Sequence, residues 1–466
     1  MSKLMRVAVL GGLASLIAAT PAAGQDVDLT APHVAADNSF ILICAVLVLF
    51  MQAGFAMVEM GFVRAKNAAH AMVKSLLNIV IGALGFAFVG YHVAFSGADW
   101  VGFSWSWNGP LTAASGAPSL TMPVHFLFTM SLAAVVAAIV SGALAERVRF
   151  KASLTAALMT SAVVYPIVVS WVWGGGWLAK LNTPFIDFAG SGVVHLTGGT
   201  AALVGAAVLG PRIGRYDADG NSHPIPGHNL SMVMLGVLVL FVGWFGMAAG
   251  GLLSADLQIG MIAVVTAIGA AAGGLGSAIA SWITLKTADV TLIGNGVLGG
   301  LVAVTAGVAS LSFFGAVIVG LVAGVIVTNS VLVLDRLRID DPVGAVPVHL
   351  ASAVWGLLAL GFLADPDAVA GGEGPAGLLY GGSAAQLVSQ MIGVVAILVF
   401  SAATAGALFL VVQSLGWLRL SADEEMAGHD LVSHTTLAYN EDVTGNDSIG
   451  VDDVSALDGF FDDLNV

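Results

Sequence analysis

Two aspartate–histidine pairs with the same spacing are the residues of this sequence best suited to chemistry. Asp187 precedes His195 by eight residues, and Asp341 precedes His349 by eight residues. The chain around them is strongly apolar, and an ionisable side chain inside a membrane costs roughly 2.5 to 3.5 kcal/mol on insertion scales. A cost of this size requires a compensating role, and the repeated spacing favours a role that the two pairs share.

His195 and His349 are the histidines that we expect inside apolar spans, whereas His92 and His125 fall near span ends. For a single buried histidine the alternative is an interhelical hydrogen bond with no further role. Two neutral imidazoles can share one N–H···N bond and leave one donor and one acceptor toward a lumen. Such a pair suits a small species that donates a hydrogen bond and gives up a proton, which favours ammonium. A potassium ion would need a ring of oxygen ligands instead.

The elements that must position these residues follow from composition. The 466-residue chain is 58% hydrophobic and 9% charged, with a mean hydropathy of +0.95. Its apolar runs reach about 20 residues, which predicts helices and not the roughly 10-residue strands of a membrane barrel. The 59 glycines fit closely packed helices. We therefore expect an all-α polytopic membrane protein with eleven transmembrane helices, at 39–63, 70–95, 122–146, 152–173, 192–211, 230–253, 257–284, 290–308, 311–334, 346–364 and 384–417.

Basic residues test the direction of these spans. Beyond the first 24 residues, twelve Lys and Arg side chains fall at alternate span ends, and Lys180 alone falls at the other ends. This asymmetry satisfies the positive-inside rule. Residues 1–24 carry Lys3 and Arg6 before a short apolar core and small residues, which predicts a cleaved signal peptide, with an uncleaved anchor as the alternative. We expect an inner-membrane protein with an extracytoplasmic mature N-terminus and a cytoplasmic C-terminus.

The two aspartate–histidine pairs begin the fifth and the tenth expected span. A duplicated unit of five helices has an odd number of crossings, so its two copies point in opposite directions across the membrane. The pattern thus predicts an inverted five-helix repeat with a site near the midplane between the halves. The eleventh helix would lie outside the repeat.

Composition divides the chain into a signal peptide at 1–24, a membrane domain at 25–418 and an acidic cytoplasmic tail at 419–466. Twelve acidic residues and no Lys or Arg lie between Asp423 and Asp463, and they account for most of the formal charge of −14. The end of the tail is polar enough to be disordered and solvated, with a short docking element around Phe460 and Phe461 as the alternative.

Four other residues each allow two roles. Asp187 could bind a cation, but a cap on the following helix is favoured, because direct contact would hold a cation too tightly for conduction. Trp173 could present its ring to a cation or lie in an interfacial aromatic belt. Trp244 could line a lumen or serve in packing. Glu59 could have a role in transport, but an interfacial pair with the basic residues about one helical turn away is favoured.

Several stretches resemble motifs of the ammonium transporter family, which is related to the Rhesus proteins: MQAGFAMVEMGFVRAKN, SGALAERVRF, VWGGG, DFAGSGVVH, LGPRIGRYDADGN, PGHNL, GWFG and DDPVGAVPVH. Their order and spacing match the family from about residue 38 to about residue 440. The resemblance implies a homotrimer with a pore through each eleven-helix subunit. It also implies that ammonium, or its analogue methylammonium, is deprotonated at the outer mouth before ammonia passes twin histidines.

Carried over by position, this resemblance assigns roles to five residues. His195 and His349 look like the family's pore histidines, and Trp244 looks like a further pore aromatic. Trp173 and Asp187 look like members of the recruitment site at the outer mouth.

The resemblance breaks down at the entrance of the pore. The two gate phenylalanines fall on Leu132 and Met247, with Phe128 as a substitute one turn earlier. The recruitment-site serine falls on Gly251, with Ser254 three residues further on. An outer site without that hydroxyl should bind ammonium more weakly, and the pore should be less occluded. Restoring the serine at position 251 and the phenylalanine at position 247 is expected to strengthen binding.

The sequence thus favours an ammonium transporter and not an enzyme. One alternative is an ammonium sensor or regulatory paralogue with little transport, and another is a Rhesus-like channel for neutral gas, against which Trp173 argues. The sequence shows no nucleotide loop, metal cluster or nucleophile–base pattern, so we expect no cofactor, metal or nucleic-acid partner. Residues 418–439 resemble the family's regulatory C-terminus, which suggests a PII-type signal protein as a cytoplasmic partner.

Overall fold

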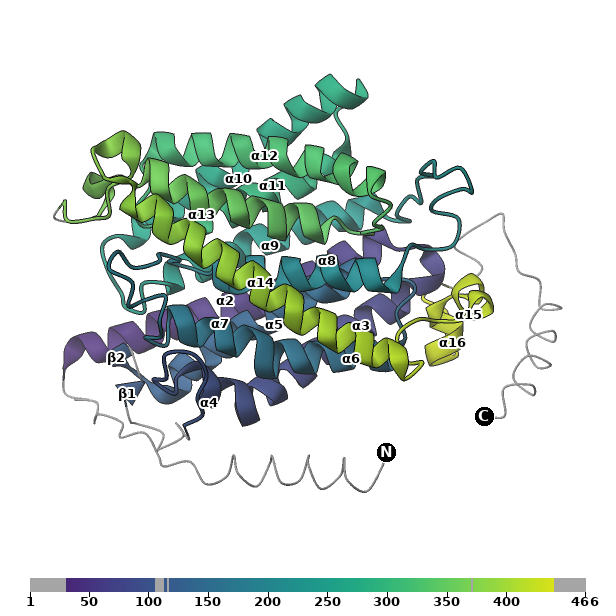
Figure 1. The fold of residues 1–466 in the computed structure, drawn as a ribbon, viewed down its shortest axis with the longest axis horizontal. Helices are drawn as coiled ribbons and strands as arrows, with labels where there is room; N and C mark the ends of the chain where they lie inside the picture. The colour runs from purple at the N-terminus through teal and green to yellow at the C-terminus, as the bar shows by residue number, and fades with distance from the viewer. Residues whose placement is uncertain (1–30, 105–112, 115–116, 370–371, 440–466) are drawn as a thin grey trace.

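The computed structural model describes residues 31–104, 113–114, 117–369 and 372–439 (Figure 1). The expected signal peptide at 1–24 and the alternative docking element at Phe460 and Phe461 lie outside these residues.

Within the described ranges the chain forms a bundle of long helices that run along the longest dimension of the molecule (Figure 1). The α-helices are α2 (Pro32–Phe62), α3 (Ala68–Gly85), α4 (Tyr91–Ala94), α5 (Met122–Ala143), α6 (Phe150–Met159), α7 (Tyr165–Val172), α8 (Thr197–Leu209), α9 (Leu230–Gly250), α10 (Ile259–Leu285), α11 (Val290–Thr305), α12 (Phe313–Arg336), α13 (Ser352–Leu363), α14 (Ala384–Ser414), α15 (Ala422–Ala427) and α16 (His429–His434). Four π-helical segments begin or connect helices, namely η2 (Phe86–Gly90), η3 (Thr160–Val164), η4 (Ser191–Leu196) and η5 (Val346–Ala351). The 3-10 turns are η1 (Ala65–Asn67), η6 (Pro366–Ala368) and η7 (Leu378–Tyr380), and β1 (Ala113–Ala114) pairs antiparallel with β2 (Ala117–Thr121).

The number and type of spans agree with the sequence. Among the described residues, ten helical segments are long and apolar enough to cross a membrane, and α11 is a shorter apolar helix of 16 residues. The fifth span combines η4 with α8, and the tenth combines η5 with α13. The prediction of an all-α polytopic membrane protein is confirmed.

The first span begins earlier than expected. Helix α2 starts at Pro32, although hydropathy alone places the start near residue 39. Its first turns contain Asp37 and Asn38, whose polar groups are satisfied by distant segments. The backbone N–H of Ala255 donates to the Asp37 carboxylate at 2.8 Å, and the backbone N–H of Thr121 donates to Asn38 Oδ1 at 2.9 Å. Because these partners lie far along the chain, hydropathy could not show them.

Glycine allows some of the helices to touch through their backbones, as the composition predicts. A Cβ atom added to Gly324 of α12 would lie 2.0 Å from the carbonyl oxygen of Gly273 of α10. A Cβ atom added to Gly236 of α9 would lie 2.7 Å from the carbonyl oxygen of Gly54 of α2. Any side chain at these positions would push the helices apart.

The two aspartate–histidine pairs begin two spans with the same local structure. The Asp187 carboxylate accepts backbone N–H groups three, five and six residues on, at 3.2, 2.8 and 2.7 Å. The Asp341 carboxylate accepts N–H groups three and five residues on, at 3.1 and 2.7 Å. Gly190 and Gly344, each three residues after its aspartate, have φ values of 106° and 77°, which favour glycine. A π-helical segment that contains the histidine follows each of these turns.

The two spans cross in opposite directions. Segment η4, which begins the fifth span, packs against α13, which ends the tenth span. Segment η5, which begins the tenth span, packs against α8, which ends the fifth span. This is the antiparallel arrangement that an inverted repeat predicts. It brings the two histidine-bearing segments η4 and η5 into contact.

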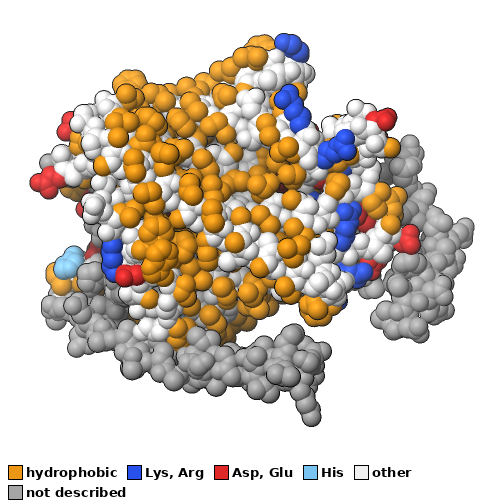
Figure 2. All heavy atoms as spheres, viewed as in Figure 1, with side chains coloured by type: hydrophobic (Ala, Val, Ile, Leu, Met, Phe, Trp, Pro, Cys, Tyr) orange, Lys and Arg blue, Asp and Glu red, His pale blue; other side chains and the backbone are white. Residues whose placement is uncertain are grey.

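The molecule has an apolar girdle between two polar ends. In Figure 2, hydrophobic side chains are spread over the surface along the helices, and Lys and Arg gather mainly at one end. We call this end the basic face, and it includes Arg64, Arg149, Arg212, Arg336 and Arg419. The opposite end, where α7 runs into Trp173, is called the tryptophan face and includes Trp100, Trp171, Trp173 and Trp177. Exposed apolar side chains such as those of α14 suit contact with lipid.

The segment that follows the last span packs onto the basic face. Helix α16 packs against α3, and α15 packs against α16 (Figure 1). The Asp430 carboxylate accepts the backbone N–H groups of Ala69 and His70 at 3.1 and 2.8 Å, at the N-terminus of α3. The backbone N–H of His429 donates to Asn67 Oδ1 at 2.9 Å. Asp430 thus binds backbone N–H groups at the start of α3.

Candidate functional site

The structure brings His195 and His349 together. Their Nδ1 atoms are 3.1 Å apart, and their ring centroids are separated by 5.1 Å with an interplanar angle of 17°. The residues are 0% and 4% exposed. Because a neutral imidazole carries one proton, one Nδ1 donates and the other accepts, so that one Nε2 keeps a lone pair and the other a hydrogen. Nε2 of His195 has no hydrogen-bond partner among the described residues.

Trp244 packs on the histidine pair. Its ring is stacked on that of His195, with centroids 4.9 Å apart and an interplanar angle of 14°. The indole N–H donates to Thr305 Oγ1 at 2.8 Å, which fixes the ring. On the other side, the Phe55 ring lies 6.1 Å from that of His349. Aromatic rings thus hold the imidazoles in place.

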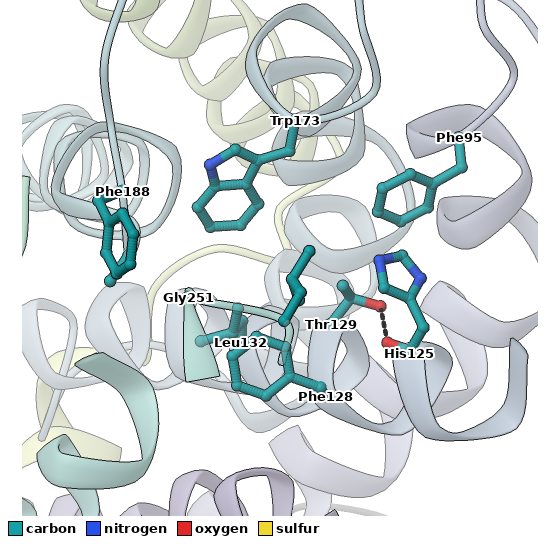
Figure 3. A pocket seen from close by; sticks show the side chains of 10 residues that line it. Phe95, His125, Phe128, Thr129, Leu132, Trp173, Phe188 and Gly251 are labelled. Atoms are coloured by element: carbon teal, nitrogen blue, oxygen red, sulfur yellow. Dashed lines mark hydrogen bonds between the residues drawn. The ribbon is translucent and has the colours of Figure 1, made fainter. Parts of the chain in front are cut away.

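A cavity of about 130 Å³ opens beside Trp173, and we call it the Trp173 cavity (Figure 3). It is lined by Phe95, His125, Phe128, Thr129, Leu132, Trp173, Phe188, Ala189, Gly251 and Leu253. The walls are mainly apolar and aromatic, a composition that suits a small ligand bound by few polar groups. Four of the residues singled out from the sequence as entrance residues, namely Phe128, Leu132, Trp173 and Gly251, are among the lining residues.

Trp173 and Asp187 are joined at one wall of this region. The indole N–H of Trp173 donates to the backbone carbonyl of Asp187 at 2.8 Å, so its ring is held at the edge of the cavity. The Asp187 side chain is turned away from the cavity and caps η4, which is the arrangement favoured from the sequence. Its carboxylate therefore fixes the backbone that carries both the wall and His195.

The two expected gate positions differ in their surroundings. Leu132 and Phe128 both line the Trp173 cavity from α5, so the phenylalanine one turn earlier does supply a ring there. Met247 is fully buried and is not a lining residue. Its Cε atom lies against Gly190, 3.3 Å from the position that a Cβ atom would occupy.

Gly251 occupies a position without room for a side chain. A Cβ atom there would lie 2.8 Å from the backbone carbonyl oxygen of Phe188 and 2.9 Å from its ring. Ser254 does not take over the role of a serine at 251, because it is not a lining residue and its hydroxyl donates to the carbonyl of Leu252 at 3.4 Å. Because Gly251 has no side chain, the cavity lacks a hydroxyl at this position, and Phe188 can approach closely.

The sequence places His125 near a span end and indicates no role for it, yet it lines the Trp173 cavity. Its Nδ1 atom is 3.0 Å from the Tyr91 hydroxyl oxygen, and its ring packs edge-on against Phe95 with centroids 4.6 Å apart. A signal was available, because residues 125, 128, 129 and 132 follow the helical spacing that places side chains on one face. His125 therefore lies on the same face as the expected gate residue Leu132.

On the other side of the histidine pair, cavities lead to the basic face. A small cavity of about 30 Å³ is bordered by His349, Phe55, Glu59 and Asn295. A larger one of about 390 Å³ lies at the basic face. Gly344 borders both.

Glu59 has a different partner from the one expected. Its carboxylate forms a buried ion pair with Lys74 of α3 and accepts a hydrogen bond from Ser141 at 3.1 Å. The basic residues one turn away bind elsewhere. Arg64 pairs with Glu146, and Lys66 donates to backbone carbonyls of α15. Because α3 packs against α2, Lys74 lies closer to Glu59 than Arg64 and Lys66 do, although these two are nearer in the sequence.

The loop before η5 is fixed by a buried ionic network at the basic face. Arg212 donates to both oxygens of Asp340, at 2.8 and 3.0 Å, and to Glu146 at 3.1 Å. Burial alone would raise the pKa of Asp340, but the hydrogen bonds from Arg212 and the charge of Arg147 lower it to about 2. A carboxylate that stays ionised in this way can hold the turn at Asp341 in position.

Comparisons with known proteins agree with the fold. The model of the Ammonium Transporter Family matches residues 39–439. The chain is 42% identical over 420 residues to the ammonium transporter Amt2 of Archaeoglobus fulgidus, covering 88% of this chain and 89% of the relative. A solved structure titled "Sensor Amt Protein" is 31% identical with a TM-score of 0.79, covering 86% of this chain and 99% of its own. The crystal structure of Candida albicans Mep2 is 26% identical with a TM-score of 0.75, covering 84% and 87%.

The chain is thus a polytopic helical membrane protein with cavities on both sides of a buried histidine pair. The chain belongs to the Ammonium Transporter Family.

Proposed function

We propose that this protein transports ammonium across the cell inner membrane, with the Trp173 cavity as its entrance. The observation that carries the proposal is the contact between His195 and His349, with cavities on either side of the pair. The positive-inside rule assigns the basic face to the cytoplasm and the tryptophan face to the outside. A cleaved signal peptide then leaves the mature N-terminus extracytoplasmic.

The proposed route follows the chemistry of each region. Ammonium enters the Trp173 cavity, where an aromatic face attracts a cation by about 0.5 to 2 kcal/mol. It gives up its proton before the apolar section beyond Leu132, because a bare cation is costly there and neutral ammonia is not. The proton crosses separately to the cytoplasm, so that one net charge moves with each ammonia and transport carries a current. Ammonia then passes His195 and His349, whose free Nε2 atoms offer it a donor and an acceptor. The basic-face cavities provide the exit.

A sensor is the second candidate function. It is favoured by the similarity to the structure titled "Sensor Amt Protein" and by the docking of α15 and α16 against α3. In that case ammonium at the Trp173 cavity would change the docked segment with little net transport. A neutral gas channel is disfavoured, because the Trp173 ring at the entrance suits a cation.

We also propose a homotrimer, in line with the resemblance, with its contacts on the apolar girdle. A PII-type signal protein is proposed to bind the cytoplasmic basic face, where α15 and α16 border the exit region.

Growth in a host that lacks its own ammonium transporters tests transport against sensing. We expect the wild-type chain to restore growth when ammonium is scarce, because a route through the membrane supplies nitrogen. Comparable membrane expression of the chain without any rescue of growth would contradict transport and favour the sensor.

A further inference from the structure

His125 offers a hydrogen-bonding atom to the Trp173 cavity that no part of the route above uses. Figure 3 shows its ring between Phe95 and Thr129, with one ring nitrogen directed into the cavity. The residue is 3% exposed, and its ring is fixed by its neighbours. Nδ1 is bound to the Tyr91 hydroxyl, whereas Nε2 has no hydrogen-bond partner among the described residues and borders the cavity.

Few other side chains that line the Trp173 cavity could accept a hydrogen bond from a cation. The indole N–H of Trp173 is occupied by the Asp187 carbonyl. The Thr129 hydroxyl donates to the His125 backbone carbonyl at 2.8 Å, although its oxygen can still accept. The remaining seven lining residues have apolar side chains or, at Gly251, none. His125 and Thr129 are therefore the side chains that could accept a hydrogen bond from a cation in the cavity.

The Tyr91 contact lets His125 act as an acceptor. A hydroxyl can donate or accept, so Nδ1 can carry the proton and donate to the Tyr91 oxygen. In this tautomer the lone pair of Nε2 faces the cavity. A hydrogen bond from a cation is charge-assisted and roughly twice as strong as a neutral one, so a bound cation favours this tautomer.

We infer that Nε2 of His125 accepts a hydrogen bond from ammonium in the Trp173 cavity and supplies the acceptor that Gly251 lacks. This inference rests on the proposed function, because it concerns the ligand of the same cavity. It places the hydrogen-bonding wall on α5, opposite the position where the resemblance locates a serine. His125 is thus a binding residue that determines the affinity of the entrance.

The test compares ammonium-dependent currents across proteoliposomes for the wild type, His125→Phe, His125→Gln and Thr129→Val. His125→Phe keeps a ring but removes the acceptor, so the half-saturating ammonium concentration should rise about ten- to hundredfold, as expected for a hydrogen bond to a charge. His125→Gln should recover most of the affinity, because its amide oxygen can accept. Thr129→Val removes the other possible acceptor, and it should raise the half-saturating concentration less than His125→Phe does.

The outcomes separate this inference from the proposed function. Ammonium binding to purified protein, followed by tryptophan fluorescence, gives a readout that does not need transport. If the wild type carries no current but His125→Phe weakens binding, the transport proposal fails and the inference stands. If the wild type carries current and His125→Phe has the wild-type half-saturation and binding, the inference is overturned. A loss confined to Thr129→Val also overturns it.

If His125→Phe does not fold, a substitution of Tyr91, the hydrogen-bond partner of His125, tests the inference instead. Tyr91→Phe keeps the imidazole and removes only the hydroxyl that holds Nδ1. We expect it to raise the half-saturating concentration by a smaller factor than the loss of His125. Unchanged affinity in Tyr91→Phe, together with a misfolded His125→Phe, would overturn the inference, because the tautomer that presents the Nε2 lone pair to the cavity would not matter.

Discussion

Gly251 shows how one residue can alter both the chemistry and the shape of a binding site. Its missing side chain removes a hydroxyl from the entrance and lets the Phe188 backbone approach to a distance that no Cβ atom tolerates. The missing hydroxyl can be predicted from the sequence, because this effect depends only on the residue type. The second effect depends on a segment more than sixty residues away in the chain. The simple expectation that a serine here restores binding therefore needs revision.

Gly251→Ser should destabilise the protein by about 1 to 3 kcal/mol, because the added atoms overpack against a backbone carbonyl that cannot rotate away. It should not strengthen ammonium binding by itself. The measurement is thermal unfolding of purified protein. Gly260→Ser is the matched control, since a Cβ atom there meets nothing within 4 Å. Equal stability of the two variants, or tighter binding by Gly251→Ser, would contradict the steric argument.

The residues of the histidine pair could be predicted from their spacing, whereas the place of His125 in the wall of the Trp173 cavity was not predicted. His195 and His349 stood out because each is deep in an apolar run and follows an aspartate at the same distance. His125 was classed by its place near a span end. Its helical spacing from Leu132 was visible, but its Tyr91 partner lies on α4 and could be found only in the folded structure.

At the scale of elements, two capped π-helical segments position the pair. Each begins with an aspartate that binds backbone N–H groups and a glycine with positive φ. These features explain why the aspartates are kept in an apolar region, since each carboxylate satisfies donors that a helix start leaves unpaired. The spacing in the sequence predicted the duplication and its orientation. It could not predict the π-helical geometry, which depends on packing between the halves.

The docking of α15 and α16 is an element-scale feature that hydropathy did not predict. His429 is buried against His70, with ring centroids 3.8 Å apart, and its Nδ1 contacts Ser433 Oγ at 3.0 Å. Lys74 and His434 face the same cluster, and Asp430 binds the start of α3 beside it. Burial, with smaller contributions from Lys74 and His434, lowers the pKa of His429 to about 3 from its ordinary value of 6.5.

Acidification should therefore release this segment. Above pH 6.5, His429 is neutral whether docked or free, so the docking free energy is fully present. Below that value the released form binds a proton and the docked form does not, which weakens docking by up to about 1.4 kcal/mol per pH unit until pH 3 is approached.

Hydrogen exchange of residues 422–434 measures this release. After correction for intrinsic rates, protection should fall about tenfold between about pH 7.5 and about pH 5.5. His429→Gln is the control, and its protection should depend less on pH. Protection that stays constant, or that increases as the pH falls, would contradict the assignment of a neutral buried His429.

For the whole molecule, the sequence predicted more of the structure than it did for single residues or single elements. Hydrophobic content and run length alone gave the helical bundle and its spans, because a membrane admits few other solutions. The charge asymmetry of span ends agrees with the clustering of Lys and Arg at one end of the molecule (Figure 2). The central claim is that ammonium crosses this bundle past His195 and His349, which lie between the two faces.

The most direct test of that claim is the ammonium-dependent current of proteoliposomes that contain the wild type, His195→Ala or His349→Ala. The account predicts that the wild type gives a saturable ammonium current. Either substitution should abolish that current or change its selectivity over potassium, because it removes one half of the shared hydrogen bond. Unchanged flux and selectivity in both variants, at equal reconstitution, would contradict a route past the histidine pair.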